Sequence, residues 1–249
     1  MSTPILQASG LTMRFGGVVA LSNVDFSIAE VELRCLIGPN GAGKSTFFKC
    51  LTGVYKPTAG TVQFRGRSTA GLGGPQIARL GVGIKTQVPN VFDGLDVREN
   101  IRLAAARVLP PQTARKRVDE MLQRLNIGTI AAAQVGRLAH GHRQLVELAM
   151  VMAPDPDLVL LDEPAAGMNP TETIGLSVLL QGLRGGGLSI LLVEHDMAFV
   201  MGLSDQVTVL NFGRVIADGR PAAIRHDALV IEAYLGHKVA ARLAAEAGS

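Results

Sequence analysis

Cysteine, charge and long apolar runs are all scarce in this chain of 249 residues. Only Cys35 and Cys50 are present, both beside apolar residues, so we expect buried free thiols in a reducing cytosol rather than a disulfide. No stretch approaches the ~18–20 consecutive apolar residues that a membrane-spanning helix needs. Met1–Gly10 also lacks the basic and apolar regions of a secretory signal. We therefore expect a soluble protein.

The charge is low and nearly balanced, with 24 basic and 21 acidic residues and a net charge of +3. A dedicated nucleic-acid-binding protein usually shows a clustered basic face, so we expect no nucleic-acid partner. Hydrophobic residues make up 47% of the chain, which is enough for one large α/β domain or a core with an inserted lobe. The low charge suggests that partners cover part of the apolar surface.

The first part of the chain alternates β-type runs with glycine-rich turns. Three runs are predicted to form an antiparallel layer: Ile5–Ser9, Val24–Ile28 and Thr61–Arg65. A further strand over Glu32–Ile37 leads into a glycine-rich loop and then into a helix from Ser45 to about Leu51.

The middle of the chain is predicted to be a helical lobe inserted into this core. Helices are expected over Asn100–Val108, over Gln112–Leu125 and from about His142. We place the lobe at residues 91–153, the two halves of the core at 1–90 and 154–236, and a tail at 237–249, in which Lys238–Ala247 is a candidate frayed helix.

After the lobe, β and α segments alternate as in a parallel sheet covered by helices. The expected elements are strands at Leu158–Asp162, Ser189–Val193 and Gln206–Leu210, with helices at Thr171–Leu183 and Met197–Leu203. Leu158–Leu161 and Ile190–Val193 are apolar on both faces, which is typical of central strands in such a sheet.

One glycine-rich segment has the pattern G-x-x-x-x-G-K-[ST] of a phosphate-binding loop. It consists of Gly38, Pro39, Asn40, Gly41, Ala42, Gly43, Lys44, Ser45 and Thr46. Backbone N–H groups and the N-terminus of the following helix would surround the phosphates, Lys44 would reach the β- and γ-phosphates, and Ser45 would bind Mg²⁺. A chance match is the alternative, but the position between a strand and a helix favours binding of ATP with Mg²⁺.

Two acids end the strand at Leu158–Asp162. Asp162 comes at the carboxyl end of the strand, where open α/β folds bind their ligands, so we assign it to Mg²⁺. Glu163 is expected to point the other way along the pleat and to polarise the water that attacks the γ-phosphate. The alternative is a solvated acidic turn.

Two further polar residues follow strands. His195 comes after Ser189–Val193 and could donate a hydrogen bond to phosphate oxygens. Gln87 follows the strand at Gly81–Lys85 and could reach Mg²⁺ or the attacking water. Taken alone, His195 is more typical of a surface turn, and Gln87 is uninformative.

In their order and spacing, these residues resemble the ATP-binding subunits of ABC transporters over nearly the whole chain. Gly38–Thr46 is similar to Walker A, Leu158–Glu163 to Walker B, Gln87 to the Q-loop glutamine and His195 to the switch histidine. The remaining matches are Ala165–Asn169 with the D-loop, Leu138–His142 with the signature loop, and Phe15 with the aromatic residue that stacks on adenine. The resemblance implies a P-loop NTPase (RecA-like) parallel core, an antiparallel β layer and an inserted α-helical lobe.

Finer features resemble the importers of branched-chain amino acids and amides: Met13–Gly17, Asp162–Pro170, Glu194–Met197 and Ala233–Gly236. Two other stretches, Glu32–Ile37 and Leu138–Gly141, are also similar to urea-importer ATPases of the same group. The cargo therefore stays open among branched-chain amino acids, amides and urea.

The signature segment departs from the family pattern LSGGQ. Ala139 replaces the common serine and His142 the glutamine, while His140 and Gly141 lie between them. Backbone N–H groups near Gly141 could still bind phosphate, and we expect this face to be weakened, with one strong and one weak site in an asymmetric pair. A metal site at His140 and His142 is a second interpretation, without a third ligand in view.

The resemblance also implies partners and a place in the cell. It implies a second ATPase subunit in a head-to-tail dimer, membrane permease subunits, and a solute-binding protein of the same system, at the cytoplasmic face of the membrane. A non-transport ABC ATPase is a rival, but neither a long coiled-coil insertion nor a second P-loop is present. A P-loop kinase or GTPase is another, without an acceptor or guanine-recognition motif.

Overall fold

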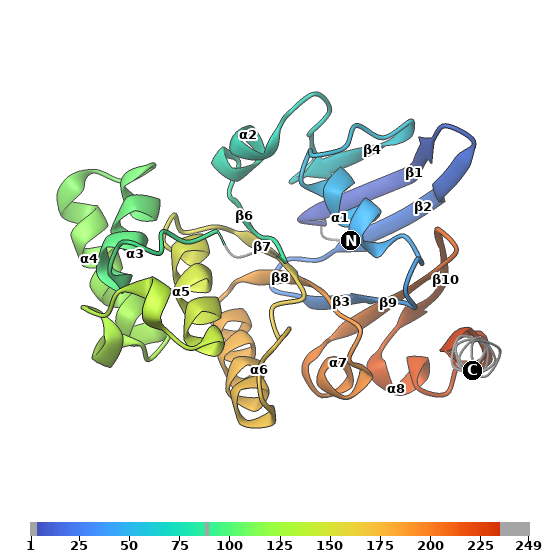
Figure 1. The fold of residues 1–249 in the computed structure, drawn as a ribbon. Coiled ribbons are helices and arrows are strands. Elements are labelled where there is room, and N and C mark those ends of the chain that lie inside the picture. The colour runs from blue at the N-terminus through green and yellow to red at the C-terminus, as the bar shows by residue number, and fades with distance from the viewer. Residues whose placement is uncertain (1–3, 88–89, 235–249) are drawn as a thin grey trace, which may run out of the picture. The chain divides into compact units, whose positions relative to one another are not determined.

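The computed structural model of the protein describes residues 4–87 and 90–234 (Figure 1). The chain forms two compact units, the first from residues 1–77 and 191–249 and the second from residues 78–190. The predicted helix at Lys238–Ala247 and the last two residues of Ala233–Gly236 lie outside the described residues. Within the described part, no helix is both long and apolar enough to cross a membrane.

The first unit contains the antiparallel layer that the sequence predicts. Its strands lie in the order β2-β1-β4-β5. Their bounds are Leu6–Phe15 for β1, Val18–Ile28 for β2, Ala59–Phe64 for β4 and Arg67–Ser68 for β5. The prediction ended the first strand at Ser9, but β1 continues to Phe15 because Gly10, with φ 60°, forms an irregularity in the pairing rather than a turn. This extension carries Phe15 to the end of a hairpin.

The first unit also holds the strand that leads into the glycine-rich loop. β3 (Leu33–Ile37) pairs in parallel with β9 (Gln206–Asn211), and the strand order is β10-β9-β3-β8. The division between the units falls inside β8 (Ser189–Val193), and every residue of β3 and β8 is buried. β10 (Arg214–Gly219) was not predicted, because its exposed and half-buried residues give no apolar run. The helices of this unit are α1 (Lys44–Leu51), α7 (Met197–Leu203) and α8 (Pro221–Ile224).

The second unit combines a parallel strand pair with the predicted helices. β6 (Val82–Lys85) pairs in parallel with β7 (Leu158–Asp162). The helices are α3 (Val97–Ala106), α4 (Pro111–Arg124), α5 (His140–Met152) and α6 (Pro170–Gly185), with short 3₁₀ helices at Gly128–Ile130 and Val135–Arg137. The short helix α2 (Gly74–Arg79) crosses the division between the units. α3, α4 and α5 pack on one another, and their apolar faces form one core (green to yellow-green in Figure 1).

Two helices begin earlier than predicted because a capping box fixes each start. Asp96 accepts a hydrogen bond from the Glu99 backbone N–H, and the Glu99 side chain accepts one from the Asp96 N–H, so α3 begins at Val97 rather than Asn100. Asn169 and Glu172 make the same reciprocal pair at the start of α6. The helix expected from His142 begins at His140.

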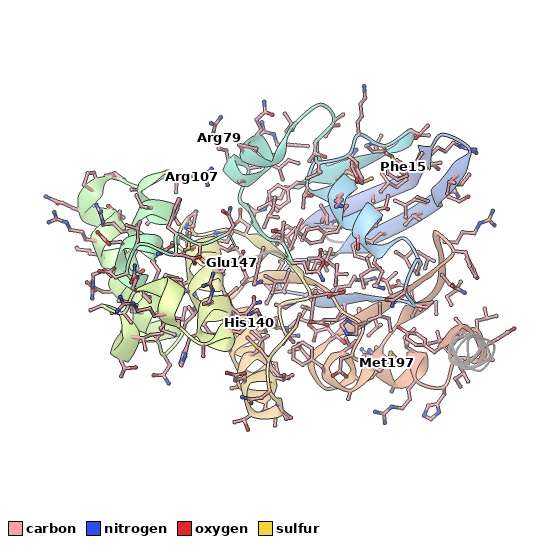
Figure 2. All side chains as sticks on the ribbon, in the orientation of Figure 1. Phe15, Arg79, Arg107, His140, Glu147 and Met197 are labelled. Carbon is pink, nitrogen blue, oxygen red and sulfur yellow. The ribbon has the colours of Figure 1, made fainter. Side chains whose placement is uncertain are left out.

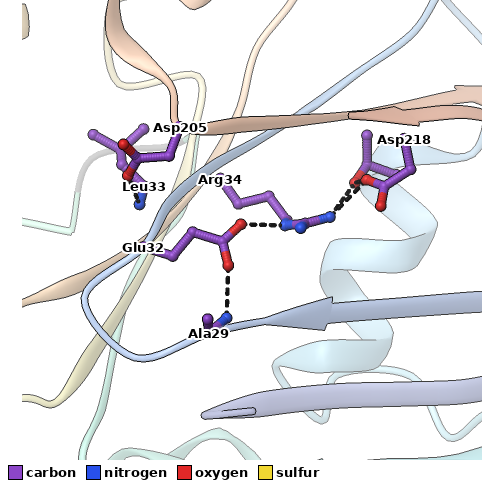
Figure 3. A network of polar contacts seen from close by, with 7 residues as sticks. Ala29, Glu32, Leu33, Arg34, Asp205 and Asp218 are labelled. Carbon is purple, nitrogen blue, oxygen red and sulfur yellow. Dashed lines mark hydrogen bonds and ion pairs between the residues drawn. The ribbon is translucent and has the colours of Figure 1, made fainter. Parts of the chain in front are cut away.

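A buried polar network links β3 to the neighbouring edge of its sheet (Figure 3). Arg34 Nε lies 2.7 Å from Glu32 Oε1, and its Nη1 lies 2.6 Å from Asp218 Oδ1 and 3.1 Å from Thr208 Oγ1. The guanidinium also lies over the Phe26 ring, with 5.6 Å between Cζ and the ring centroid. Arg34 is 8% exposed, so these contacts replace water as the partners of its charge.

Replacement of Arg34 by methionine is expected to lower the free energy of unfolding by about 3 kcal/mol, because it leaves the buried Glu32 carboxylate without its cation. Urea unfolding followed by circular dichroism measures the change. The control is Glu30→Gln, which breaks the exposed Arg65–Glu30 pair (3.8 Å) and should cost less than about 1 kcal/mol. Equal effects of the two substitutions would contradict the stabilising role of the buried network.

Candidate functional site

The glycine-rich loop leaves the buried strand β3 in a conformation that requires glycine. A Cβ atom on Gly38 would overlap the carbonyl oxygen of Leu210. On Gly43, with φ 106°, it would lie 2.8 Å from the carbonyl oxygen of Ala20. The loop therefore packs with its backbone against neighbouring strands, as a phosphate cradle requires. Gly43 is the N-cap of α1 and supplies no side chain to cap the helix, so polar atoms of a ligand can bind there.

Lys44 is the first residue of α1, and its side chain folds back over the loop. Its Nζ donates hydrogen bonds to the carbonyl oxygens of Gly38 at 2.7 Å and Pro39 at 3.1 Å, and the residue is only 7% exposed. Ser45 is exposed on the same helix turn, and Thr46 is half-buried. The charge of Lys44 is thus held at the loop by backbone carbonyl groups.

An aromatic pair lies in the same unit at the end of β1, where Figure 2 labels Phe15. Phe15 is 43% exposed, and its ring meets that of Tyr55 edge to face with 5.3 Å between centroids. Lys49 Nζ lies 5.3 Å from the centroid of the Tyr55 ring. The sequence pointed to Phe15 but missed Tyr55, whose only signal was that it is one of two tyrosines in the chain. Phe15 is thus part of an aromatic pair and still presents exposed ring surface to solvent.

Replacement of Phe15 by alanine is expected to weaken ATP binding by about 1–3 kcal/mol, the usual contribution of stacking between a base and an aromatic ring. Phe15→Tyr should retain most of the affinity, because the ring remains. Fluorescence titration with a labelled ATP analogue measures the change, and Leu229→Ala removes another exposed apolar side chain as the control. Wild-type affinity in Phe15→Ala would exclude stacking on this ring.

His195 follows β8 and is accessible. Its side chain is 59% exposed, and its Nδ1 lies 3.9 Å from the Oε2 of Glu194, which is buried. The next residue, Asp196, caps α7 by accepting hydrogen bonds from the N–H groups of Ala198 and Phe199. The segment is therefore fixed on both sides of an imidazole that can reach a ligand.

Tyr234 is a neighbour of the phosphate loop that the motifs did not indicate. Its hydroxyl is buried beside the backbone of Gly38, and among the residues that the structure describes it has no hydrogen bond of good geometry. Burial raises the pKa of Tyr234 to about 12, so the phenol stays protonated at neutral pH. A contact between residues so far apart in sequence leaves no local pattern.

In the second unit, two of the predicted catalytic side chains meet. Gln87, two residues after β6, donates a hydrogen bond from Nε2 to Glu163 Oε2 at 3.0 Å. Asp162 is the last residue of β7, as predicted. The expected reason for the orientation of Glu163 is wrong: Glu163 lies beyond the strand with φ 47°, so a left-handed backbone turn directs it rather than the alternation of the pleat. Such a conformation is costly for a non-glycine residue and is concentrated at functional sites.

The signature segment forms the start of α5. Ala139 is the N-cap and makes no side-chain hydrogen bond, which a serine could make. His140 Nε2 lies 2.9 Å from the carbonyl oxygen of Ala166, to which it donates when it carries the proton. A Cβ on Gly141 would overlap the Glu172 carboxylate, which also accepts a hydrogen bond from the Asn169 N–H at 2.9 Å. The helix start thus lies close to the loop before α6.

The residues assigned to Mg²⁺ offer the ligand atoms that this ion prefers. They are the Ser45 hydroxyl, the Gln87 amide oxygen and the Asp162 carboxylate, all hard oxygen donors. The Gln87 amide directs its NH₂ group to Glu163, which leaves the oxygen end for a cation. Each of these donors is therefore chemically suited to Mg²⁺, which is usually bound through one or two carboxylates together with substrate phosphates.

Comparison with known proteins gives matches over nearly the whole chain. The model of the ABC transporter family matches residues 21–166, and that of the branched-chain amino acid ATP-binding cassette transporter matches residues 214–240. The chain is 43% identical to the high-affinity branched-chain amino acid transport ATP-binding protein LivG of Salmonella typhimurium, covering 95% of this chain and 99% of that one. It is 42% identical, with the same coverage, to BraF of Pseudomonas aeruginosa, which has the same description. Among solved structures, the ADP conformation of MJ1267, an ATP-binding cassette of an ABC transporter, has a TM-score of 0.84 at 25% identity and covers 94% of this chain and 100% of that one. The predicted fold class is confirmed.

Proposed function

Because the chain belongs to the ABC transporter family of ATP-binding proteins, we propose that its hydrolysis of ATP drives the import of branched-chain amino acids through permease subunits. The observation that carries the ATPase assignment is the glycine cradle at Gly38 with Lys44 Nζ already bound to its carbonyl groups. The cargo rests on the description of the relatives LivG and BraF, which match nearly the whole chain.

Each site residue has a chemical role in this proposal. Lys44 and the loop N–H groups bind the β- and γ-phosphates, and Phe15 stacks on adenine. Ser45, Gln87 and Asp162 would hold Mg²⁺, which neutralises phosphate charge when bound.

The hydrolytic step needs a base and a donor to the phosphate. Glu163 accepts a proton from the attacking water, and the Gln87 amide holds the carboxylate for this task. His195 donates a hydrogen bond to the γ-phosphate oxygens, where charge develops.

The partners follow from the arrangement of the family. We propose a head-to-tail pair with a second ATPase subunit, in which Ala139, His140 and Gly141 serve the nucleotide of the other subunit. Permease subunits would bind at the cytoplasmic face of the membrane, and a solute-binding protein would deliver the cargo to them. Amides and urea remain the alternative cargoes, since the chain motifs resemble importers of all three.

Uptake by cells tests the assignment and separates the cargoes. Deletion of the gene should abolish high-affinity uptake of labelled leucine, and the wild-type gene but not Glu163→Gln should restore it. Labelled urea and a short amide are measured in parallel. Loss of urea or amide uptake with intact leucine uptake would change the assigned cargo from branched-chain amino acids to urea or amides. Intact uptake of all three compounds would reject the import function.

A further inference from the structure

One buried side chain, Glu147 of α5, holds the segment that carries Gln87 at two points. Its Oε2 lies 2.8 Å from Lys85 Nζ, at the end of β6, and its Oε1 accepts a hydrogen bond from the Asn90 backbone N–H at 2.9 Å. Gln87 lies between these two anchors in the sequence, and its amide donates to Glu163. Glu147 is labelled on its helix in Figure 2.

The buried ion pair between Lys85 and Glu147 has a high desolvation cost. The side chains of Lys85 and Glu147 are 1% and 3% exposed. In the described part of the chain, Lys85 Nζ and Glu147 Oε2 make no hydrogen bond beyond this pairing. Two charges removed from water with so few partners contribute little net stability, and a well-packed apolar pair often does as well or better. The pair therefore calls for a role other than stability.

The position of Glu147 on its helix supplies such a role. α5 begins at His140, inside the signature segment, and Glu147 follows seven residues later. At 1.5 Å per residue, a rigid helix places the two about 10 Å apart along its axis. A shift of the helix start is thus passed directly to Lys85 and Asn90.

We propose that Glu147 is a positioning residue: by holding Lys85 and Asn90 on either side of Gln87, it places the Gln87 amide against Glu163 and couples that contact to the position of α5. The inference rests on the proposed function, because it assigns Glu147 to the Gln87–Glu163 pair of that site. A merely structural pair would instead pack α5 against β6 and affect activity only through folding.

The two contacts of Glu147 can be separated by paired substitutions in the full-length chain. Lys85→Met with Glu147→Gln removes both charges but keeps a carbonyl oxygen for the Asn90 N–H. Lys85→Met with Glu147→Leu removes the charges and the acceptor, and fills the same space with apolar atoms. Asp119→Asn, which breaks the exposed Arg98–Asp119 pair, is the control.

The kcat and KM for MgATP and the unfolding midpoint are measured for each variant. The Leu variant should lower kcat about tenfold relative to the Gln variant, with KM within about twofold, because a misplaced group slows the chemical step more than it weakens binding. Equal kcat values in these two folded variants would overturn the proposal. If the Leu variant does not fold, Glu147→Asp, which shortens the reach to both anchors, takes its place with the same expected loss.

Measurements in the Gln87→Ala variant distinguish a positioning role of Glu147 from a purely structural one. If Glu147 acts through Gln87, adding Lys85→Met and Glu147→Leu to Gln87→Ala should lower kcat by less than about a further twofold. Additive losses would overturn the positioning role while leaving the proposed function intact. A wild-type kcat in Gln87→Ala would instead reject the role of Gln87 in the proposed function, and the inference with it.

Discussion

Glu163→Gln is expected to lower ATP turnover by about 10²–10⁴-fold, the usual effect of removing a general base. The glutamine keeps the shape of the side chain and can still contact Gln87, which lies 3.0 Å away. It cannot accept a proton from water at neutral pH. MgATP binding should therefore persist, and the protein should retain nucleotide without hydrolysing it. Phosphate release measures turnover, and equilibrium dialysis measures binding.

The control for this substitution is Glu120→Gln, which neutralises an exposed glutamate of α4 that pairs with Arg117 and lies outside the site. Its turnover should match the wild type. Wild-type turnover in Glu163→Gln would show that another group activates the water. A loss of MgATP binding in the same variant would mean that Glu163 contributes to the phosphate or metal contacts instead.

Lys44→Ala is expected to weaken nucleotide binding by at least about 10²-fold, so that no nucleotide is retained after gel filtration. A charged hydrogen bond contributes about 1.5–3 kcal/mol, and this lysine is also the cation that the loop keeps buried. The carbonyl groups of Gly38 and Pro39 would lose their donor as well, which loosens the cradle.

Lys56→Ala provides the comparison, because Lys56 is an exposed lysine of the same unit outside the loop. Its nucleotide affinity should not change. Isothermal titration with a non-hydrolysable ATP analogue in the presence and absence of Mg²⁺ separates the loop from the metal ligands. Unchanged affinity in Lys44→Ala would contradict the assignment of the phosphate loop.

Much of the fold was predictable because its strands carry strong local patterns. The apolar runs Leu158–Leu161 in β7 and Ile190–Val193 in β8 identified central strands, and the glycine motif placed the loop between β3 and α1. β10 escaped prediction because an edge strand with mixed burial has no alternating pattern. The starts of α3 and α6 depend on capping residues, which precede the apolar stripe.

The identity and order of the site residues could be predicted from the sequence, but the contacts between them could not. Gln87, Asp162 and Glu163 follow strands in recognisable order, yet nothing in the sequence states that the first donates to the third. Glutamate rarely adopts the left-handed backbone conformation that Glu163 has, so there was no reason in the sequence to expect this turn. Tyr55 and Glu147 act through long-range packing, which leaves no spacing to read.

The close approach of Gly141 to Glu172 has an evolutionary consequence. Glu172 also belongs to the capping box with Asn169, so a side chain at position 141 would displace a carboxylate that the start of α6 needs. The two positions should therefore vary together across lineages: a larger residue at 141 should be tolerated only where 172 has become short. An alignment of homologues would then show covariation linking two segments that single-site comparison treats as independent.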